Sequence, residues 1–129
     1  KATAIGGRNG LIKSEDGVIN MKVRIPTKLG GKGGNYTNPE QLFASGYAAC
    51  FDSALNHIAT INKLNIESTT SATIGLAKKN DSYQLTASLE VKIEGINAEA
   101  AKKLVDKAHT TCPYSNAIKN NIDVKINLI

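Results

Sequence analysis

Residues 37–51 read TNPEQLFASGYAACF and open the longest predicted helix of the chain. A side-chain oxygen of Thr37 or Asn38 can cap this helix, and the proline that follows suits its first position because proline has no amide hydrogen to leave unpaired there. Glu40 adds a negative charge to the first turn, where the helix dipole favours it. The apolar pattern continues and predicts a helix over residues 39–62 that is apolar on more than one side. Such a helix is buried in a core or in an interface.

Runs of apolar residues predict strands on both sides of this helix. Residues 11–13 and 17–25 flank a polar turn and predict a hairpin, with the odd-numbered residues of its second strand on the buried face. Residues 66–78 and 82–95 predict two further strands, and the second of these alternates cleanly between apolar and polar residues. Because one face of this strand is polar, we expect an antiparallel sheet.

The last third of the chain predicts a second helix and a final strand. The helix covers residues 98–110, with Asn97 as its cap and Pro113 just beyond its end, and the strand covers residues 122–128. The predicted order is β-β-α-β-β-α-β. Because strands and helices do not alternate one for one, this order predicts an α+β fold rather than a doubly wound parallel sheet. We expect the whole chain, 1–129, to be one domain.

The composition excludes several classes of function. The net charge of +5 comes from 16 Lys and Arg against 11 Asp and Glu, but Arg8 and Arg24 are the only arginines, Trp is absent, and aromatic residues are 5%. Because nucleic-acid recognition favours arginine and aromatic side chains, we interpret the charge as a solvated lysine surface and expect no nucleic-acid partner. No apolar run is long enough to span a membrane, so no membrane partner is expected. No secretory segment is recognisable, which favours a reducing, cytoplasmic location.

Two cysteines, Cys50 and Cys112, are the candidate reactive groups. A free cysteine is often a small buried hydrophobic residue, and Cys50 fits that interpretation because its neighbours suit a packed helix. Cys112 lies at a predicted helix end, directly before a proline. The residues alone allow a stable disulfide, a redox pair or two separate thiols. The spacing of the cysteines and of His57 and His109 matches no zinc pattern, so we predict no metal site. His109 is three residues before Cys112 and could face it, but we expect surface or capping roles for both histidines.

Charged and glycine-rich segments supply the remaining candidates. Arg8 lies between glycines in GGRNG, residues 6–10. It is either a solvated arginine in a turn or a fixed cation that lowers a thiol pKa or binds an anion. Glu40 by itself is explained by the helix dipole. The glycine-rich residues 30–34 lack the spacing of a phosphate-binding loop and predict a loop beside a site.

Taken together, these segments resemble the organic hydroperoxide resistance (Ohr) family of the wider OsmC/Ohr superfamily. The matching segments are GGR at 6–8, TNPEQLFA and GYAACF within 37–51, and AH, CPYSNA and NIDV within 108–124. The resemblance covers essentially the whole chain, and CPYSNA favours the Ohr branch over the OsmC branch. It implies an α+β fold with antiparallel sheets packed around a long central helix, and an intertwined homodimer.

The resemblance also implies an activity. Members of the family are bacterial thiol-dependent peroxidases that reduce organic and fatty-acid hydroperoxides to alcohols and protect against organic peroxide stress. By matching positions, Cys50 would be the peroxidatic cysteine and Cys112 the resolving cysteine, joined in a Cys50–Cys112 disulfide during turnover. Arg8 would activate the thiolate, and Glu40 would orient Arg8. A lipoylated protein or a small dithiol of the dihydrolipoamide type would be the reductant, and no metal or other cofactor is needed.

Apolar residues near the cysteines would suit a lipid-like substrate. We predict that Phe43, Tyr47, Phe51 and Tyr114 line the substrate pocket.

Glu40 and Cys50 are ten residues apart on one helix, which corresponds to about 15 Å along its axis. We therefore predict that Arg8 and Glu40 serve the Cys50 of a second subunit. Two alternatives remain: an OsmC-type peroxidase of broader substrate range, and a non-enzymatic dimeric stress or binding protein with inert cysteines.

Overall fold

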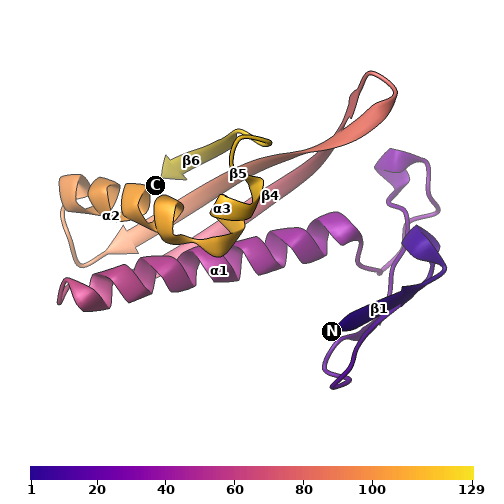
Figure 1. The fold of residues 1–129 in the computed structure, drawn as a ribbon, viewed down its shortest axis with the longest axis horizontal. Coiled ribbons are helices and arrows are strands. Elements are labelled where there is room, and N and C mark those ends of the chain that lie inside the picture. The colour runs from indigo at the N-terminus through magenta and orange to yellow at the C-terminus, as the bar shows by residue number, and fades with distance from the viewer. The chain divides into compact units, whose positions relative to one another are not determined.

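The structure is a computed structural model that describes residues 1–129. The chain forms two compact units, Lys1–Leu42 and Phe43–Ile129, which are described separately below. The elements in chain order (Figure 1) are β1 (Ala2–Ile5), η1 (Gly7–Asn9), β2 (Leu11–Ser14), β3 (Asn20–Lys22), η2 (Thr27–Leu29), α1 (Pro39–Ile61), β4 (Glu67–Lys79), β5 (Ser82–Glu94), α2 (Ala98–Thr111), α3 (Pro113–Ile118) and β6 (Val124–Leu128). Two sheets and a long helix confirm the predicted α+β class.

The N-terminal unit is built on a small antiparallel sheet. Its strands lie in the order β1-β2-β3, with Ala2 opposite Ser14 and Leu11 opposite Lys22. Its buried apolar side chain is Val23, which also forms a bridge to Thr37. Other large apolar side chains of this unit are exposed, namely Ile5, Leu11, Val18, Ile19, Met21 and Leu29. The N-terminal unit therefore exposes several large apolar side chains, in its strands and in its loops.

The strand prediction was only partly correct in this unit. The predicted second strand, 17–25, is too long, because β3 contains only three residues. The expectation of a buried odd-numbered face was wrong for Ile19 and Met21, which are 37% and 38% exposed, although Val23 is buried. Alternation shows which residues share a face, but burial also needs a layer that covers that face. The strand β1 was not predicted.

Helix α1 begins where its sequence indicates. The Asn38 side-chain oxygen accepts a hydrogen bond of 2.9 Å from the backbone N–H of Gln41, so Asn38 is the cap. The helix runs from Pro39 to Ile61, one residue short of the prediction. Its buried side chains form a stripe at helical spacing that lies in the core of the C-terminal unit: Tyr47, Phe51, Ala54, Leu55, Ile58 and Ala59.

The C-terminal sheet has the strand order β4-β5-β6. Strands β4 and β5 form the predicted antiparallel hairpin, and Ala87, Leu89 and Val91 are buried while Glu90 is exposed, which confirms the alternation. Strand β6 pairs with β5 in parallel, so the expectation of purely antiparallel sheets was wrong here. A parallel neighbour requires a crossover connection, and α2 lies in that connection.

Helix α2 and the core complete this unit. The Asn97 side chain accepts from the backbone N–H of Ala100 at 2.9 Å, which confirms the predicted cap. The chain does not leave helical structure at Pro113, because the short helix α3 begins there, and α3 was not predicted. Buried side chains from α1, β5, α2 and α3 form one core, and Figure 1 shows α1 and α2 along the same sheet.

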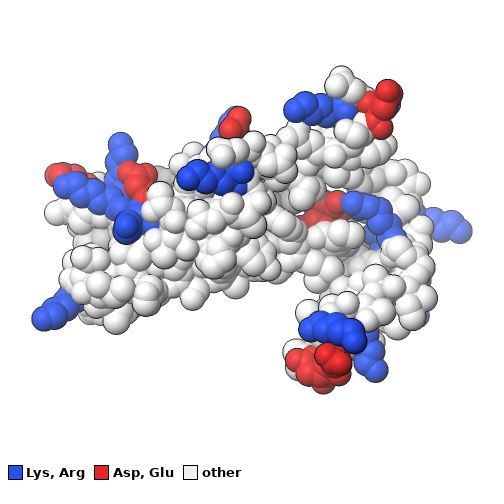
Figure 2. Space-filling view, in the orientation of Figure 1, with Lys and Arg blue, Asp and Glu red and all other residues white.

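Figure 2 shows Lys and Arg as separate groups over α2 and over the turn between β4 and β5, with Asp and Glu among them. None of the helices is both long and apolar enough to cross a lipid bilayer.

Candidate active site

Arg8 is held in the short helix η1 by contacts within the N-terminal unit. A side chain at Gly10 would overlap the carbonyl group of Ile5, so the chain can cross itself here only with glycine at that position. The Arg24 guanidinium donates a hydrogen bond of 2.9 Å to the carbonyl oxygen of the last η1 residue. The second arginine of the chain therefore supports the loop that carries the first.

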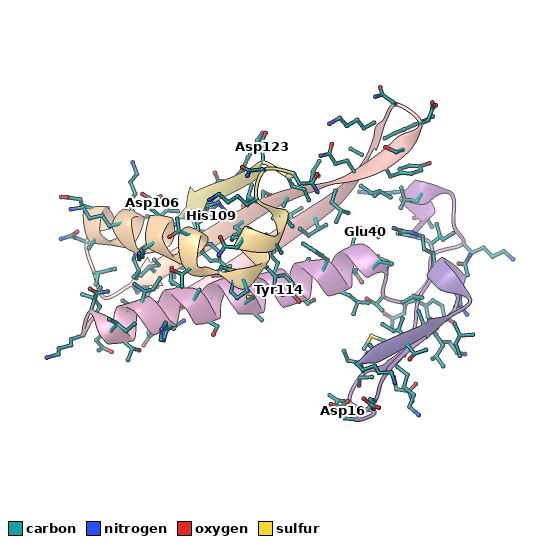
Figure 3. All side chains as sticks on the ribbon, in the orientation of Figure 1. Asp16, Glu40, Asp106, His109, Tyr114 and Asp123 are labelled. Carbon is teal, nitrogen blue, oxygen red and sulfur yellow. The ribbon has the colours of Figure 1, made fainter.

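Arg8 and Glu40 form a two-point ion pair. Arg8 Nη1 donates to Glu40 Oε2 at 2.9 Å, and Arg8 Nη2 donates to Glu40 Oε1 at 2.6 Å. The carboxylate side chain is 10% exposed and the guanidinium side chain 39%. The hydrogen bonds from Arg8 lower the pKa of Glu40, and the same pair raises the pKa of Arg8. Both groups are therefore charged at neutral pH, and Figure 3 labels Glu40 at the start of α1.

The two cysteines lie together in the C-terminal unit. Cys50 is half-buried on α1, and Cys112 is buried at the junction where α2 ends and α3 begins. Both are free thiols, and Cys112 Sγ donates to Cys50 Sγ at 3.5 Å. A disulfide needs a separation of about 2.05 Å, so the two sulfurs can be joined by a movement of roughly 1.5 Å.

Burial works against ionisation of the Cys50 thiol. Removal from water raises the pKa of Cys50, and the adjacent Cys112 sulfur raises it further. The backbone N–H of Tyr114 donates to Cys50 Sγ and lowers the pKa, but by less than burial raises it. The C-terminal unit by itself therefore favours the neutral thiol, and a reactive thiolate needs an additional positive charge.

The four predicted pocket residues differ in their access to solvent. Tyr47 and Phe51 are fully buried core residues, whereas Phe43 is half-buried and Tyr114 is 38% exposed. The rings of Phe43 and Tyr114 have centroids 5.8 Å apart, and the rings of Tyr47 and Tyr114 have centroids 6.1 Å apart. Phe43 and Tyr114 are therefore the members of the set whose side chains are open to solvent.

Two polar residues of this region were not identified as functional candidates from the sequence. Ser115 Oγ lies 2.8 Å from Tyr47 Oη and 3.0 Å from His109 Nδ1. His109 was expected to have a surface or capping role, but it is half-buried and hydrogen-bonded to Ser115. The regular spacing of His109, Cys112 and Ser115, three residues apart, is the sequence signal that could have suggested a common location.

Comparisons with known proteins agree with the motifs. The family of OsmC-like proteins matches residues 31–127. The organic hydroperoxide resistance protein of Xanthomonas axonopodis pv. citri is 43% identical over 129 residues, which cover 98% of this chain and 91% of that protein. The organic hydroperoxide resistance protein OhrA of Bacillus subtilis is 45% identical over 127 residues, which cover 96% of this chain and 90% of the relative.

Solved structures show the same fold. The crystal structure of the organic hydroperoxide resistance protein OhrB of Bacillus subtilis has a TM-score of 0.92 at 41% identity and covers 100% of this chain and 96% of that one. An organic hydroperoxide resistance protein OsmC from Legionella pneumophila has a TM-score of 0.94 at 43% identity, covering 99% of this chain and 94% of that one. The chain therefore belongs to the organic hydroperoxide resistance branch of the OsmC-like family.

Proposed function

We propose that this chain is a thiol-dependent peroxidase that reduces organic and fatty-acid hydroperoxides to alcohols, and so protects a bacterial cytoplasm against organic peroxide stress. The observation that carries the proposal is the distance of 3.5 Å between Cys50 Sγ and Cys112 Sγ. A half-buried thiol beside a fully buried one suits a nucleophile with a resolving partner. The names of the relatives agree with this substrate class.

Cys50 carries out the first step as the nucleophile. Its thiolate attacks the distal oxygen of the hydroperoxide, the S–O bond forms, and the O–O bond breaks. The alkoxide takes up a proton and leaves as the alcohol. The peroxide is thereby reduced by two electrons, and Cys50 is oxidised to a sulfenic acid.

Cys112 carries out the second step. Its sulfur attacks the Cys50 sulfenic acid, the S–S bond forms and the S–O bond breaks, and the hydroxide leaves as water with the thiol proton of Cys112. A dithiol of the dihydrolipoamide type, either free or on a lipoylated protein, then reduces the Cys50–Cys112 disulfide by thiol–disulfide exchange and becomes a disulfide itself.

A second subunit supplies the positive charge in this proposal. Helix α1 is continuous from Pro39 to Ile61, so residues 40 and 50 are separated by about 15 Å along its axis. We therefore propose a homodimer in which Arg8, oriented by Glu40, lowers the pKa of the partner's Cys50. The exposed apolar side chains of the N-terminal sheet support an intersubunit contact.

The aromatic residues near the thiols favour an apolar substrate. We propose that Phe43 and Tyr114 contact the organic group of the hydroperoxide and that the buried Tyr47 and Phe51 support them. Organic hydroperoxides should then react faster than hydrogen peroxide. Comparable rates with hydrogen peroxide would instead indicate an OsmC-type enzyme of broader range.

The direct test is turnover of cumene hydroperoxide with dihydrolipoamide by the wild type, Cys50→Ser and Cys112→Ser. We expect turnover by the wild type and none by Cys50→Ser, because that variant lacks the nucleophile. Cys112→Ser should react once and then accumulate over-oxidised Cys50, which mass spectrometry detects. If the wild type consumes no organic hydroperoxide with any dithiol, the peroxidase proposal is wrong and the cysteines belong to a non-enzymatic stress or binding protein.

A further inference from the structure

We propose that Ser115 is a positioning residue that holds the Cys112 sulfur against the Cys50 sulfur through hydrogen bonds to Tyr47 and His109. This inference rests on the proposed peroxidase function and deepens it, because it concerns how quickly the sulfenic acid is resolved. Ser115 would control the second chemical step and leave the first step unchanged.

Ser115 Oγ on one helix is within hydrogen-bond distance of side chains from two other helices. Tyr47 comes from α1, His109 from the last turn of α2, and Ser115 from the first turn of α3. The tyrosine is fully buried and the serine is 3% exposed, so solvent does not substitute readily for either partner. Figure 3 shows His109 on α2 and Tyr114, next to Ser115 in the chain, beside α1.

The three groups have one arrangement in which both hydroxyl hydrogens have an acceptor among them. A serine hydroxyl has a single hydrogen, so Ser115 can donate to only one of its two partners. If Tyr47 O–H donates to Ser115 Oγ, then Ser115 O–H donates to His109 Nδ1, which must be unprotonated. Removal of the Ser115 hydroxyl would leave the buried Tyr47 hydroxyl without this acceptor.

The N–H of Tyr114 also reaches α1, at Cys50 Sγ, but the backbone hydrogen bonds of Cys112 itself stay within α2 and α3. The backbone N–H of Cys112 donates to Ala108 at 2.8 Å, and the carbonyl of Cys112 accepts from Asn116 at 3.0 Å. These bonds fix Cys112 to α2 and α3, whereas Cys50 is on α1. Tyr47 is three residues before Cys50 on the same helix, so the two side chains share one face. The Tyr47–Ser115 bond therefore ties the junction to α1 beside the sulfur that Cys112 must reach.

This connection matters because the sulfenic acid has two competing fates. It condenses with Cys112 to give the disulfide, or it reacts with a second hydroperoxide and becomes a sulfinic acid. The first reaction depends on the alignment of two protein groups, and a displacement of about 1 Å can slow such a reaction by orders of magnitude. A looser junction would therefore favour over-oxidation.

The test compares Ser115→Ala, Ser115→Thr and Tyr47→Phe with the wild type. Each protein, fully reduced, is treated with increasing doses of cumene hydroperoxide, and intact mass spectrometry measures disulfide against sulfinic acid. We expect Ser115→Ala and Tyr47→Phe to over-oxidise at doses lower by on the order of tenfold. The rate of the first step in Ser115→Ala should remain that of the wild type. Ser115→Thr, which keeps a hydroxyl, should restore resolution, and the double variant should be no worse than either single variant.

Ser53→Ala is the matched control, because Ser53 is an exposed serine of α1. Tyr47→Phe preserves the ring and therefore decides the question if Ser115→Ala does not fold. If Ser115→Ala and Tyr47→Phe over-oxidise only at the same dose of cumene hydroperoxide as the wild type, the inference is overturned and the peroxidase function stands. A wild type that forms no Cys50–Cys112 disulfide with cumene hydroperoxide would overturn the proposed function itself, together with the inference.

Discussion

At the scale of the residue, the proposed chemistry depends on the ionisation of the Cys50 sulfur. Burial raises the pKa of Cys50, and the N–H of Tyr114 only partly opposes this effect. Even an unperturbed thiol is only a few per cent ionised at neutral pH. The proposed nucleophile therefore needs the positive charge that we assign to Arg8, and this dependence can be measured as a pH profile.

We predict that Arg8→Gln moves the pH dependence of Cys50 reactivity to higher pH. The thiolate is the deprotonated form, so loss of a nearby cation raises the pKa of Cys50 and lowers the reactive fraction below that pKa. The rate in neutral solution should fall by on the order of tenfold and recover in alkaline solution. The measurement is the rate of reaction with cumene hydroperoxide against pH, and Lys22→Gln on the exposed strand β3 is the control. An unchanged profile would show that Arg8 does not act on the thiol.

At the scale of the element, the helices and strands with a clear local sequence pattern were predicted correctly, and those without one were missed. Helices α1 and α2 each begin at an asparagine whose side chain bonds to the third residue beyond it, and such caps can be recognised in sequence. Strand β5 alternates regularly because one of its faces is buried. Helix α3 has six residues, too few to show a period, and β1 has four exposed residues. The parallel pairing of β6 depends on the path of α2, which no local pattern encodes.

The candidate site shows the same limit. Cys50, Cys112, Arg8 and Glu40 could be selected because their motifs are specific, and the structure brings them together in two pairs. Ser115 was not selected, because its three-residue spacing from Cys112 is a weak signal without knowledge of its burial and partners. Its burial and its two partners are properties of the packing of three helices. The roles of the predicted site residues and the extent of the single domain remain predictions.

Gly46 shows how one helix position constrains its neighbour. A Cβ atom there would lie 2.9 Å from Tyr114 Oη and 3.1 Å from Tyr114 Cε2, so the ring would have to move. Replacement of glycine by alanine within a helix usually stabilises it by about 1 kcal/mol. We predict that Gly46→Ala gives no such gain in the wild-type background but does so with Tyr114→Ala. Urea denaturation measures both free energies of unfolding, and an equal gain in both backgrounds would contradict the ring contact.

At the scale of the whole molecule, most of the large apolar side chains of the N-terminal unit are exposed to solvent and are not buried within that unit. Val23 is its buried apolar residue, whereas Ile5 and Val18 are 70% and 83% exposed. Exposed apolar surface of this kind indicates an interaction between proteins. In the proposed homodimer, the same contact would bring Arg8 to the other subunit, so assembly and catalysis would depend on each other.

We predict that one impaired variant and one inactive variant restore each other at neutral pH. Arg8→Ala keeps Cys50, and Cys50→Ser keeps Arg8, so a heterodimer contains one complete site if the two groups come from different chains. After joint unfolding and refolding in equal amounts, activity should reach about a quarter of the wild type, because half of the dimers are mixed and each has one site. No recovery in a mixture that contains heterodimers would show that both groups come from the same chain.

The spacing of the two cysteines along the chain also links oxidation to folding. Cys50 and Cys112 are 62 positions apart, so a bond between them closes a large covalent ring. In the chain-entropy treatment, a ring of this size reduces the freedom of the unfolded chain by about 4 kcal/mol. The oxidised protein should therefore resist unfolding better than the reduced protein. In the thermodynamic cycle of folding and oxidation, the free energy by which the disulfide stabilises the fold equals the free energy by which the fold stabilises the disulfide. A reductant must supply that free energy in each cycle. The fraction of the protein that unfolds at the higher temperature would then measure the fraction still in the disulfide form.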